Sequence, residues 1–134
     1  MANFVFPSAK KAMMDGDLAL DTATIKCVLI DQADDTPTTA DDFLNDIAAA
    51  ARVGTPQTLG TKTTTGGVFD AADVTFPSVT GDVSEGILIY EDTGDEATSH
   101  LIAYIDTATG LPVTPNGGNI TITWDSGANK IFAL

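Results

Sequence analysis

Short apolar runs, separated by turn-forming residues, recur along most of the chain. The clearest runs are 87–90 (ILIY) and 101–105 (LIAYI), which are rich in β-branched and aromatic residues and therefore predict strands. Both faces of 101–105 are apolar, so we expect this strand to lie between covered faces at the centre of a sheet. A polar loop of about ten residues separates the two runs, and antiparallel pairing is the simplest interpretation.

Alternation of apolar and polar residues predicts further strands on both sides of this pair. Segments 24–30 and 119–124 each place every second residue on one apolar face. Shorter strand pieces are expected at 3–6, 58–65, 68–70, 73–76 and 130–134. Roughly eight short strands with turn signals at close spacing are typical of a β-sandwich or barrel.

Helix signals are confined to the first fifty residues. Pro7 and Gly16 are placed to begin and end a short helix over 7–14, and Thr39 to Asp42 resembles a capping box that would open a second helix through Ile47. We therefore predict a mainly β protein: a single antiparallel, jelly-roll-like β-sandwich domain over 1–134, with one or two short helices in the N-terminal third. Residues 1–7 are a candidate N-terminal contact arm.

The charge balance narrows the range of partners. The chain has 134 residues, 43% of them hydrophobic, and a net charge of −13, with no Lys or Arg between positions 62 and 130. Such a surface repels phosphate backbones and anionic lipids, so we expect neither a nucleic acid nor a membrane as partner, but a basic or metal-bearing one. The start of the chain lacks the features of a signal peptide, which predicts synthesis in the cytoplasm.

Few residues offer catalytic chemistry. His100 is the only histidine, and the adjacent Ser99 would point to the opposite face of a strand, so the two do not form a nucleophile and base. Cys27 alternates with apolar residues and is expected to be an inert core thiol, without a disulfide partner. We therefore expect no enzyme activity, no catalytic residue and no cofactor.

Two acidic clusters could supply oxygen ligands to calcium. One contains Asp31, Asp34 and Asp35, and the other lies in the loop that contains Asp92, Asp95 and Glu96. Neither matches the spacing of an EF-hand, and a solvated loop in an acidic protein is the favoured interpretation of both. Asp92, Asp95 and Glu96 are kept as the metal candidates.

The N-terminal segment is the candidate interface. Asn3, Phe4, Val5 and Phe6 form a short, mostly apolar strand whose exposed edge would invite pairing with another chain. This predicts a contact in a homo-oligomer, a dimer or trimer, or with a capsid. The alternative, that Phe4 and Phe6 fold back onto their own core, is equally open.

Several segments spread over nearly the whole chain carry a resemblance to a known family. They are 1–3 (MAN) with Pro7 and 9–10 (AK), 24–26 (TIK) with 29–31 (LID), 42–44 (DFL), 67–76 (GVFDAADVTF), 101–106 (LIAYID), 120–125 (ITITWD) and 127–132 (GANKIF). In these segments the chain resembles small structural proteins encoded by tailed bacteriophages and prophages. The resemblance carries no catalytic motif, in agreement with the residues themselves.

The resemblance implies a structural role in the virion. A jelly-roll-like sandwich of this size is similar to capsid decoration (cement) proteins, which bind the major capsid protein on the capsid exterior and stabilise the shell. The alternative is a tail or head-fibre component with a receptor- or carbohydrate-binding face. A sugar-binding face would present exposed aromatic residues, whereas most aromatic residues here occupy strand positions expected to be buried, which favours the cement function.

Overall fold

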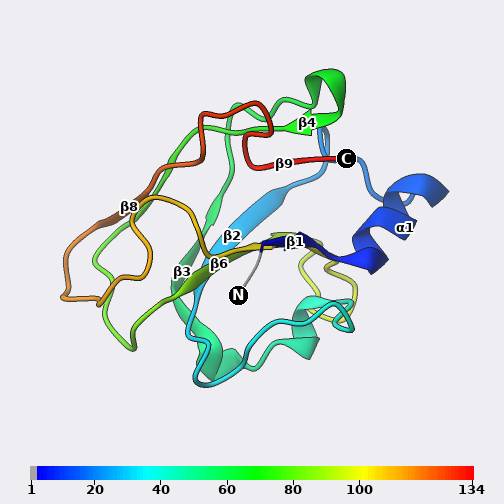
Figure 1. Cartoon of the computed structure of the whole chain (residues 1–134). Helices are drawn as coiled ribbons and strands as arrows, with labels where there is room; N and C mark the ends of the chain where they lie inside the picture. Colours follow the sequence, from blue (N-terminus) through cyan, green and yellow to red (C-terminus); the bar gives the residue numbers. More distant parts are fainter. Residues whose placement is uncertain (1–2) are drawn as a thin grey trace.

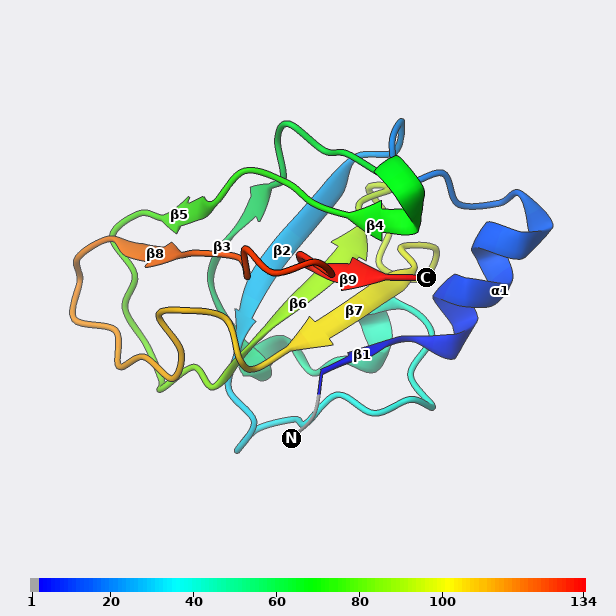
Figure 2. The ribbon, with the colours of Figure 1, turned by 45° about the horizontal axis from the view of Figure 1, so that its top comes forward.

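A five-stranded antiparallel sheet forms the centre of the molecule (Figures 1 and 2). The computed structural model describes residues 3–134, so Met1 and Ala2, which belong to the expected contact arm, lie outside the described residues. The sheet order is β1 (Phe4–Val5), β7 (Leu101–Ile105), β6 (Gly86–Glu91), β2 (Ile25–Ile30) and β3 (Arg52–Thr58). The predicted antiparallel pairing of 87–90 with 101–105 is confirmed, because β6 and β7 are neighbours in this sheet.

Two short antiparallel ribbons lie along one side of this sheet (Figure 2). One pairs β4 (Val68–Phe69) with β9 (Phe132–Ala133), and the other pairs β5 (Val74–Phe76) with β8 (Ile120–Ile122). Their aromatic side chains, together with Trp124, are buried and join the same hydrophobic cluster as the main sheet. The architecture is mainly β and antiparallel, consistent with the predicted β-sandwich, while a jelly-roll connectivity stays a prediction.

The three inner strands of the sheet are covered on both faces. Every residue of β7 is buried, and in β6 and β2 only Glu91 and Lys26 are not. Figure 1 shows the ribbons on one side of the sheet and the segment 31–51 on the other. This segment contributes the buried side chains of Leu44, Ile47 and Ala51 to the core. As predicted, both faces of 101–105 are apolar because this strand lies between two covered faces of the sheet.

The first predicted helix is confirmed, and the second is wrong. Helix α1 (Pro7–Asp15) begins with Pro7 at its first turn and ends at Gly16, whose φ of 82° is left-handed. In place of the second helix the chain makes two turns of 3-10 helix, η1 (Leu44–Asp46) and η2 (Ala49–Ala51). A third such turn, η3 (Thr65–Gly67), precedes β4.

Long-range backbone hydrogen bonds explain why no α-helix forms after Asp42. The Leu44 N–H donates to Ser99 O at 3.0 Å, and the Leu101 N–H donates to Asp42 O at 3.0 Å. These backbone groups bond to residues at the start of β7, so they are not available for the i to i+4 hydrogen bonds of an α-helix. The α1 helix is short, and none of the helices described in residues 3–134 is long and apolar enough to cross a membrane.

Strand β3 was not predicted, and its sequence explains the omission. It contains Gly54 and Pro56, which are normally signs of a turn, and the strand was expected six residues later, at the Thr-rich segment 58–65. The pairing of β3 with β2 is interrupted between Val53 and Gln57, where the register shifts, so Pro56 has no partner in the ladder and its missing N–H costs no ladder bond. Gly54 has a φ of 75°, which a β-branched residue would adopt only under strain.

The close approach of Tyr104 to the backbone of β6 generates a first prediction. A Cβ on Gly86 would overlap the Oη and Cζ atoms of Tyr104, whose hydroxyl also accepts a hydrogen bond from Gln32 Nε2 at 2.7 Å. We expect Gly86→Ala to lower the free energy of unfolding by about 2–3 kcal/mol, because the fully buried ring has no space to move. Urea unfolding measures this. Gly60→Ala is the control, since nothing lies within 4 Å of its Cβ and its φ is not positive. Equal stability of the two variants would contradict the prediction.

Candidate functional site

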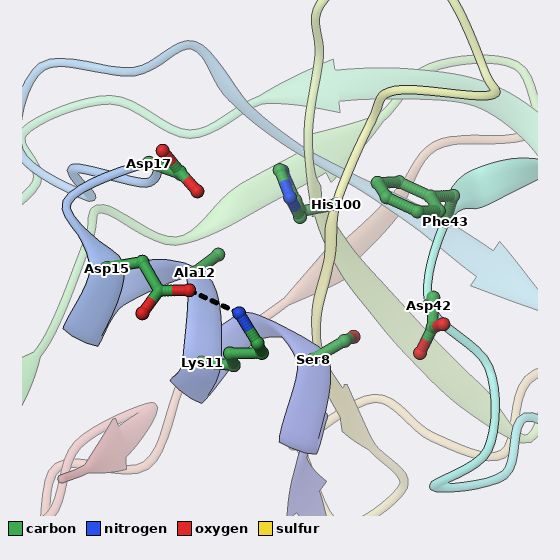
Figure 3. A pocket seen from close by; sticks show the side chains of 8 residues that line it. All are labelled: Ser8, Lys11, Ala12, Asp15, Asp17, Asp42, Phe43 and His100. Carbon is green, nitrogen blue, oxygen red and sulfur yellow. Dashed lines mark hydrogen bonds and ion pairs between the residues drawn. The ribbon is translucent and has the colours of Figure 1, made fainter.

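A surface pocket of about 210 Å³ surrounds His100, the only histidine (Figure 3). Helix α1 provides one wall, and the residues around Phe43 and His100 provide the other. Its lining residues are Ser8, Lys11, Ala12, Asp15, Asp17, Asp42, Phe43 and His100. The pocket therefore brings together one imidazole, one ammonium and three carboxylates.

His100 is held in place by its neighbours. Its Nδ1 lies 2.9 Å from Oε1 of Glu91, and its ring centroid lies 5.0 Å from that of Phe43. Residues 43 and 100 also form an isolated antiparallel bridge. A carboxylate acceptor at Nδ1 requires a proton on that nitrogen, so in the neutral ring the lone pair is on Nε2. The ring is thus oriented as a base would be.

No nucleophile accompanies this base among residues 3–134. Ser99 is buried, and its Oγ donates to Asp95 O at 2.9 Å and accepts from the Thr93 N–H at 3.2 Å, so it organises the loop before β7. Ser8 lines the pocket, but its Oγ has no hydrogen-bond partner in the described part of the chain, including His100. A nucleophile–base hydrogen bond, the starting point of covalent catalysis, is not formed here.

Cys27 lies in the core, as expected. It is fully buried in β2, and burial raises the pKa of its thiol to about 12. Its Sγ lies 3.7 Å from Gln57 O. A thiol in this environment stays protonated and is unsuited to nucleophilic chemistry.

The predicted metal candidates in the loop after β6 point to separate partners. Asp92 forms an ion pair with Lys26 at 2.9 Å, and Glu96 forms one with Arg52 at 2.8 Å. Asp95 accepts a hydrogen bond from the Ala97 N–H at 2.9 Å. The structure does not bring these three carboxylates to a common point. Asp92 and Glu96 connect the loop to β2 and β3, and Asp95 stabilises a turn within the loop.

A different acidic group is brought together at the end of β2. Oxygens of Asp31, Asp34 and Asp82 lie within 4.8 Å of one another, whereas Asp35 accepts a hydrogen bond from the Ala48 N–H at 2.8 Å. Of the cluster expected from the sequence, Asp31 and Asp34 lie together, Asp35 does not belong to the group, and Asp82 takes its place. The pairing of Ile30 with Gly86 brings Asp82 close, and this register was not evident from either segment alone.

The N-terminal candidate interface is divided between the core and an edge. Phe6 is fully buried, so this residue folds back onto its own core. Phe4 and Val5 are half-buried in β1, which pairs with β7 and forms one edge of the main sheet. Asn3 bonds to Thr107 Oγ1 at 2.7 Å and accepts from the Asp106 N–H at 2.9 Å. A contact of the β1 edge with another chain stays a prediction.

An apolar groove of about 520 Å³ lies beside this edge. It is lined by Val5 from β1, by Lys10, Met13 and Met14 from α1, and by Ala133 and Leu134 at the end of the chain. Sequence reasoning did not find this groove, because it combines the N-terminal segment with residues far away in the sequence. We refer to these six residues as the α1 groove.

No model of a protein family matches the chain, and no curated protein matches it at a significant level.

The Lys26–Asp92 pair generates a prediction on pH dependence. The hydrogen bond from Lys26 holds the pKa of the Asp92 carboxyl below its usual range, so this group stabilises the fold above its unfolded pKa of about 3.9. We expect wild type to be more stable than Asp92→Asn at neutral pH. The difference should shrink as the pH falls below about 4 and vanish once the pH has passed the lowered pKa of Asp92 in the folded state. Thermal unfolding from about pH 7 to about pH 3 measures it.

The matched control for this pair is the same substitution in a Lys26→Met background. Asn keeps an oxygen for the Gly94 N–H, which donates to Asp92 Oδ1 at 3.0 Å, so mainly the ion pair is lost. With the cation removed, Asp92→Asn should change stability less. An equal effect in both backgrounds would mean that Lys26 is not the cause.

The different burial of Phe6 and Phe4 generates a prediction for the N-terminal segment. Phe6→Ala should lower the free energy of unfolding by about 3–4 kcal/mol, because it leaves a cavity in the core. Phe4→Ala should cost about 1–2 kcal/mol, since Phe4 is half-buried and contacts Phe6 edge-on at 4.9 Å. Urea unfolding of both variants tests the order, and a larger effect at Phe4 would contradict it.

Proposed function

We propose that this chain is a non-enzymatic structural protein of a phage virion, a capsid decoration protein that binds the major capsid protein and stabilises the shell from outside. The observation that carries this proposal is the small number of large hydrophobic side chains exposed on the surface. Among residues 3–134 only Met14, Val83 and Leu134 are large exposed hydrophobic residues, and two of them line the α1 groove. A sandwich whose exposed apolar side chains are so few is suited to specific contacts with a protein partner at defined places on its surface.

The charge pattern supports a protein partner. Nineteen acidic residues face only six basic ones, and Lys11, Lys26 and Arg52 are already paired with carboxylates. The remaining acidic surface would repel DNA and anionic membranes and attract a basic patch on a shell. Neither a nucleic acid nor a membrane is part of the proposal.

The alternative, a fibre component with a carbohydrate-binding face, receives less support. Sugar-binding surfaces present exposed aromatic rings, but Trp124, both tyrosines and four of the six phenylalanines are buried in the core. The other two, Phe4 and Phe43, are half-buried and contact Phe6 and His100 respectively. No exposed aromatic platform is present in the part of the chain that the structure describes.

Electron cryomicroscopy of the virion that carries this chain tests the proposed location. We expect density on the outer capsid surface into which the five-stranded sheet and its two ribbons fit as a rigid body. Virions that lack the protein should rupture at a lower temperature. Density in the tail or a head fibre, with none on the capsid, would overturn the proposal and favour the alternative.

Salt dependence provides a separate prediction for the capsid contact. If the acidic surface faces a basic patch on the shell, occupancy on shells should fall as salt rises from about 20 mM to about 1 M, because screening shortens from tens of ångströms to about 3 Å. Occupancy is measured by co-sedimentation with purified shells. Sucrose at equal osmolality is the control. Occupancy that does not change with salt would mean an apolar contact instead.

A further inference from the structure

Three large hydrophobic side chains of residues 3–134 are exposed, and they lie at opposite ends of the molecule. Met14 and Leu134, with 81% and 64% of their surface exposed, line the α1 groove. Val83, 41% exposed, lies in the loop before β6. In both Figure 1 and Figure 2 this loop is at the far side of the molecule from α1. Exposed apolar side chains at two ends suggest two contact surfaces rather than one.

The α1 groove has an unusual charge for this protein. Its one charged side chain is Lys10, which is exposed and has no ion pair or hydrogen bond from its ammonium group within residues 3–134. The other cations are engaged: three in ion pairs, and Lys62 and Lys130 with backbone carbonyls. In a chain with a net charge of −13, the groove is thus apolar with an unpaired positive charge.

The Val83 loop carries the complementary features. Asp82 and Glu85 flank the valine, and the Asp82 carboxylate lies within 4.8 Å of oxygens of Asp31 and Asp34. Three like charges so close repel one another, and a cation placed beside them would relieve this repulsion. The loop is also held in place, because Ser84 and Val113 exchange two backbone hydrogen bonds of 2.9 Å. It therefore presents Val83 without having to be ordered first.

We propose that the protein self-associates head to tail: the α1 groove of one copy receives Val83 of a second copy, and Lys10 lies against the Asp82 side of that loop. The apolar groove meets the exposed valine, and the unpaired ammonium meets the carboxylates. Contact between two copies of the groove would instead place Lys10 against Lys10. Because the two surfaces differ and lie at opposite ends, the contact is heterologous and produces a closed ring or an open chain of copies.

This inference goes beyond the proposed function: it develops the homo-oligomer expected from the sequence and does not depend on the capsid. The contact is small, so we expect dissociation constants of about 0.1–1 mM, which become effective only at the high local concentration of a surface array. The net charge of each copy opposes association at low salt, where repulsion extends over tens of ångströms. Association should therefore strengthen between about 20 mM and 150 mM salt, since the direct ion pair is screened less than the distant charges.

Two single variants and their mixture test the geometry. Met14→Glu places a charge in the groove, and Val83→Glu places one on the loop, so each should be monomeric by sedimentation velocity up to about 1 mM. Mixed in equal amounts, they should form a heterodimer and nothing larger. The dimer joins the intact groove of the Val83→Glu chain to the intact loop of the Met14→Glu chain. Thr123→Glu, an added charge at an exposed position beside β8, should associate as wild type does.

Charge exchange provides a second readout that does not depend on the mixture. Lys10→Glu should weaken association about tenfold or more, and adding Asp82→Lys to the same chain should restore most of it, because the pair is then present with reversed signs. Thermal unfolding of each variant confirms that it is folded. A rescue that fails in folded protein would contradict the proposed pairing.

Other outcomes identify which idea is wrong. Association of Val83→Glu alone at the strength of wild type would mean that grooves pair with each other and would overturn the inference. A wild type that stays monomeric at about 1 mM would also overturn it. If wild type stays monomeric but still decorates shells, the inference fails and the proposed function stands. If shells never bind the protein but the mixture forms heterodimers, the reverse holds.

Discussion

The burial of both faces of strands β2, β6 and β7 is the constraint on which the rest of the structure depends. These strands consist almost entirely of apolar residues, so a single covering layer would leave one face in water. The two ribbons cover one face, and the segment 31–51 covers the other (Figure 1). A chain of this length has few residues left for additional elements.

The covering segment explains why many polar groups are committed to structure. Arg52 donates to Leu44 O at 3.2 Å, to Ile47 O at 2.7 Å and to Glu96 at 2.8 Å, so one guanidinium connects the 3-10 turn η1 to the acidic loop. His100 and Glu91 belong to the same junction. The acidic loop, which resembles a cation site in sequence, is thus part of the fastening. Charges free for binding lie elsewhere, at Lys10 and around Asp82.

Elements could be predicted from the sequence where the local pattern of residues agrees with the tertiary environment. The inner strands follow from their apolar runs, and α1 from Pro7 and Gly16, because these signals act within a few residues. Strand β3 could not be predicted, since Gly54 and Pro56 lie where its pairing with β2 is interrupted, and the place of this interruption depends on the register between the two strands. The same holds for the α1 groove and for the approach of Asp82 to Asp31. Each joins residues more than 50 positions apart in the sequence.

The buried thiol of Cys27 has a practical consequence for anyone who studies this protein. With its pKa raised to about 12 and no exposed surface, the native cysteine is almost inert to maleimides and other thiol reagents. A cysteine introduced at an exposed position would then be the single reactive one, without replacement of Cys27. The domain is therefore ready for attaching one dye, spin label or cross-linker at a chosen point on its surface.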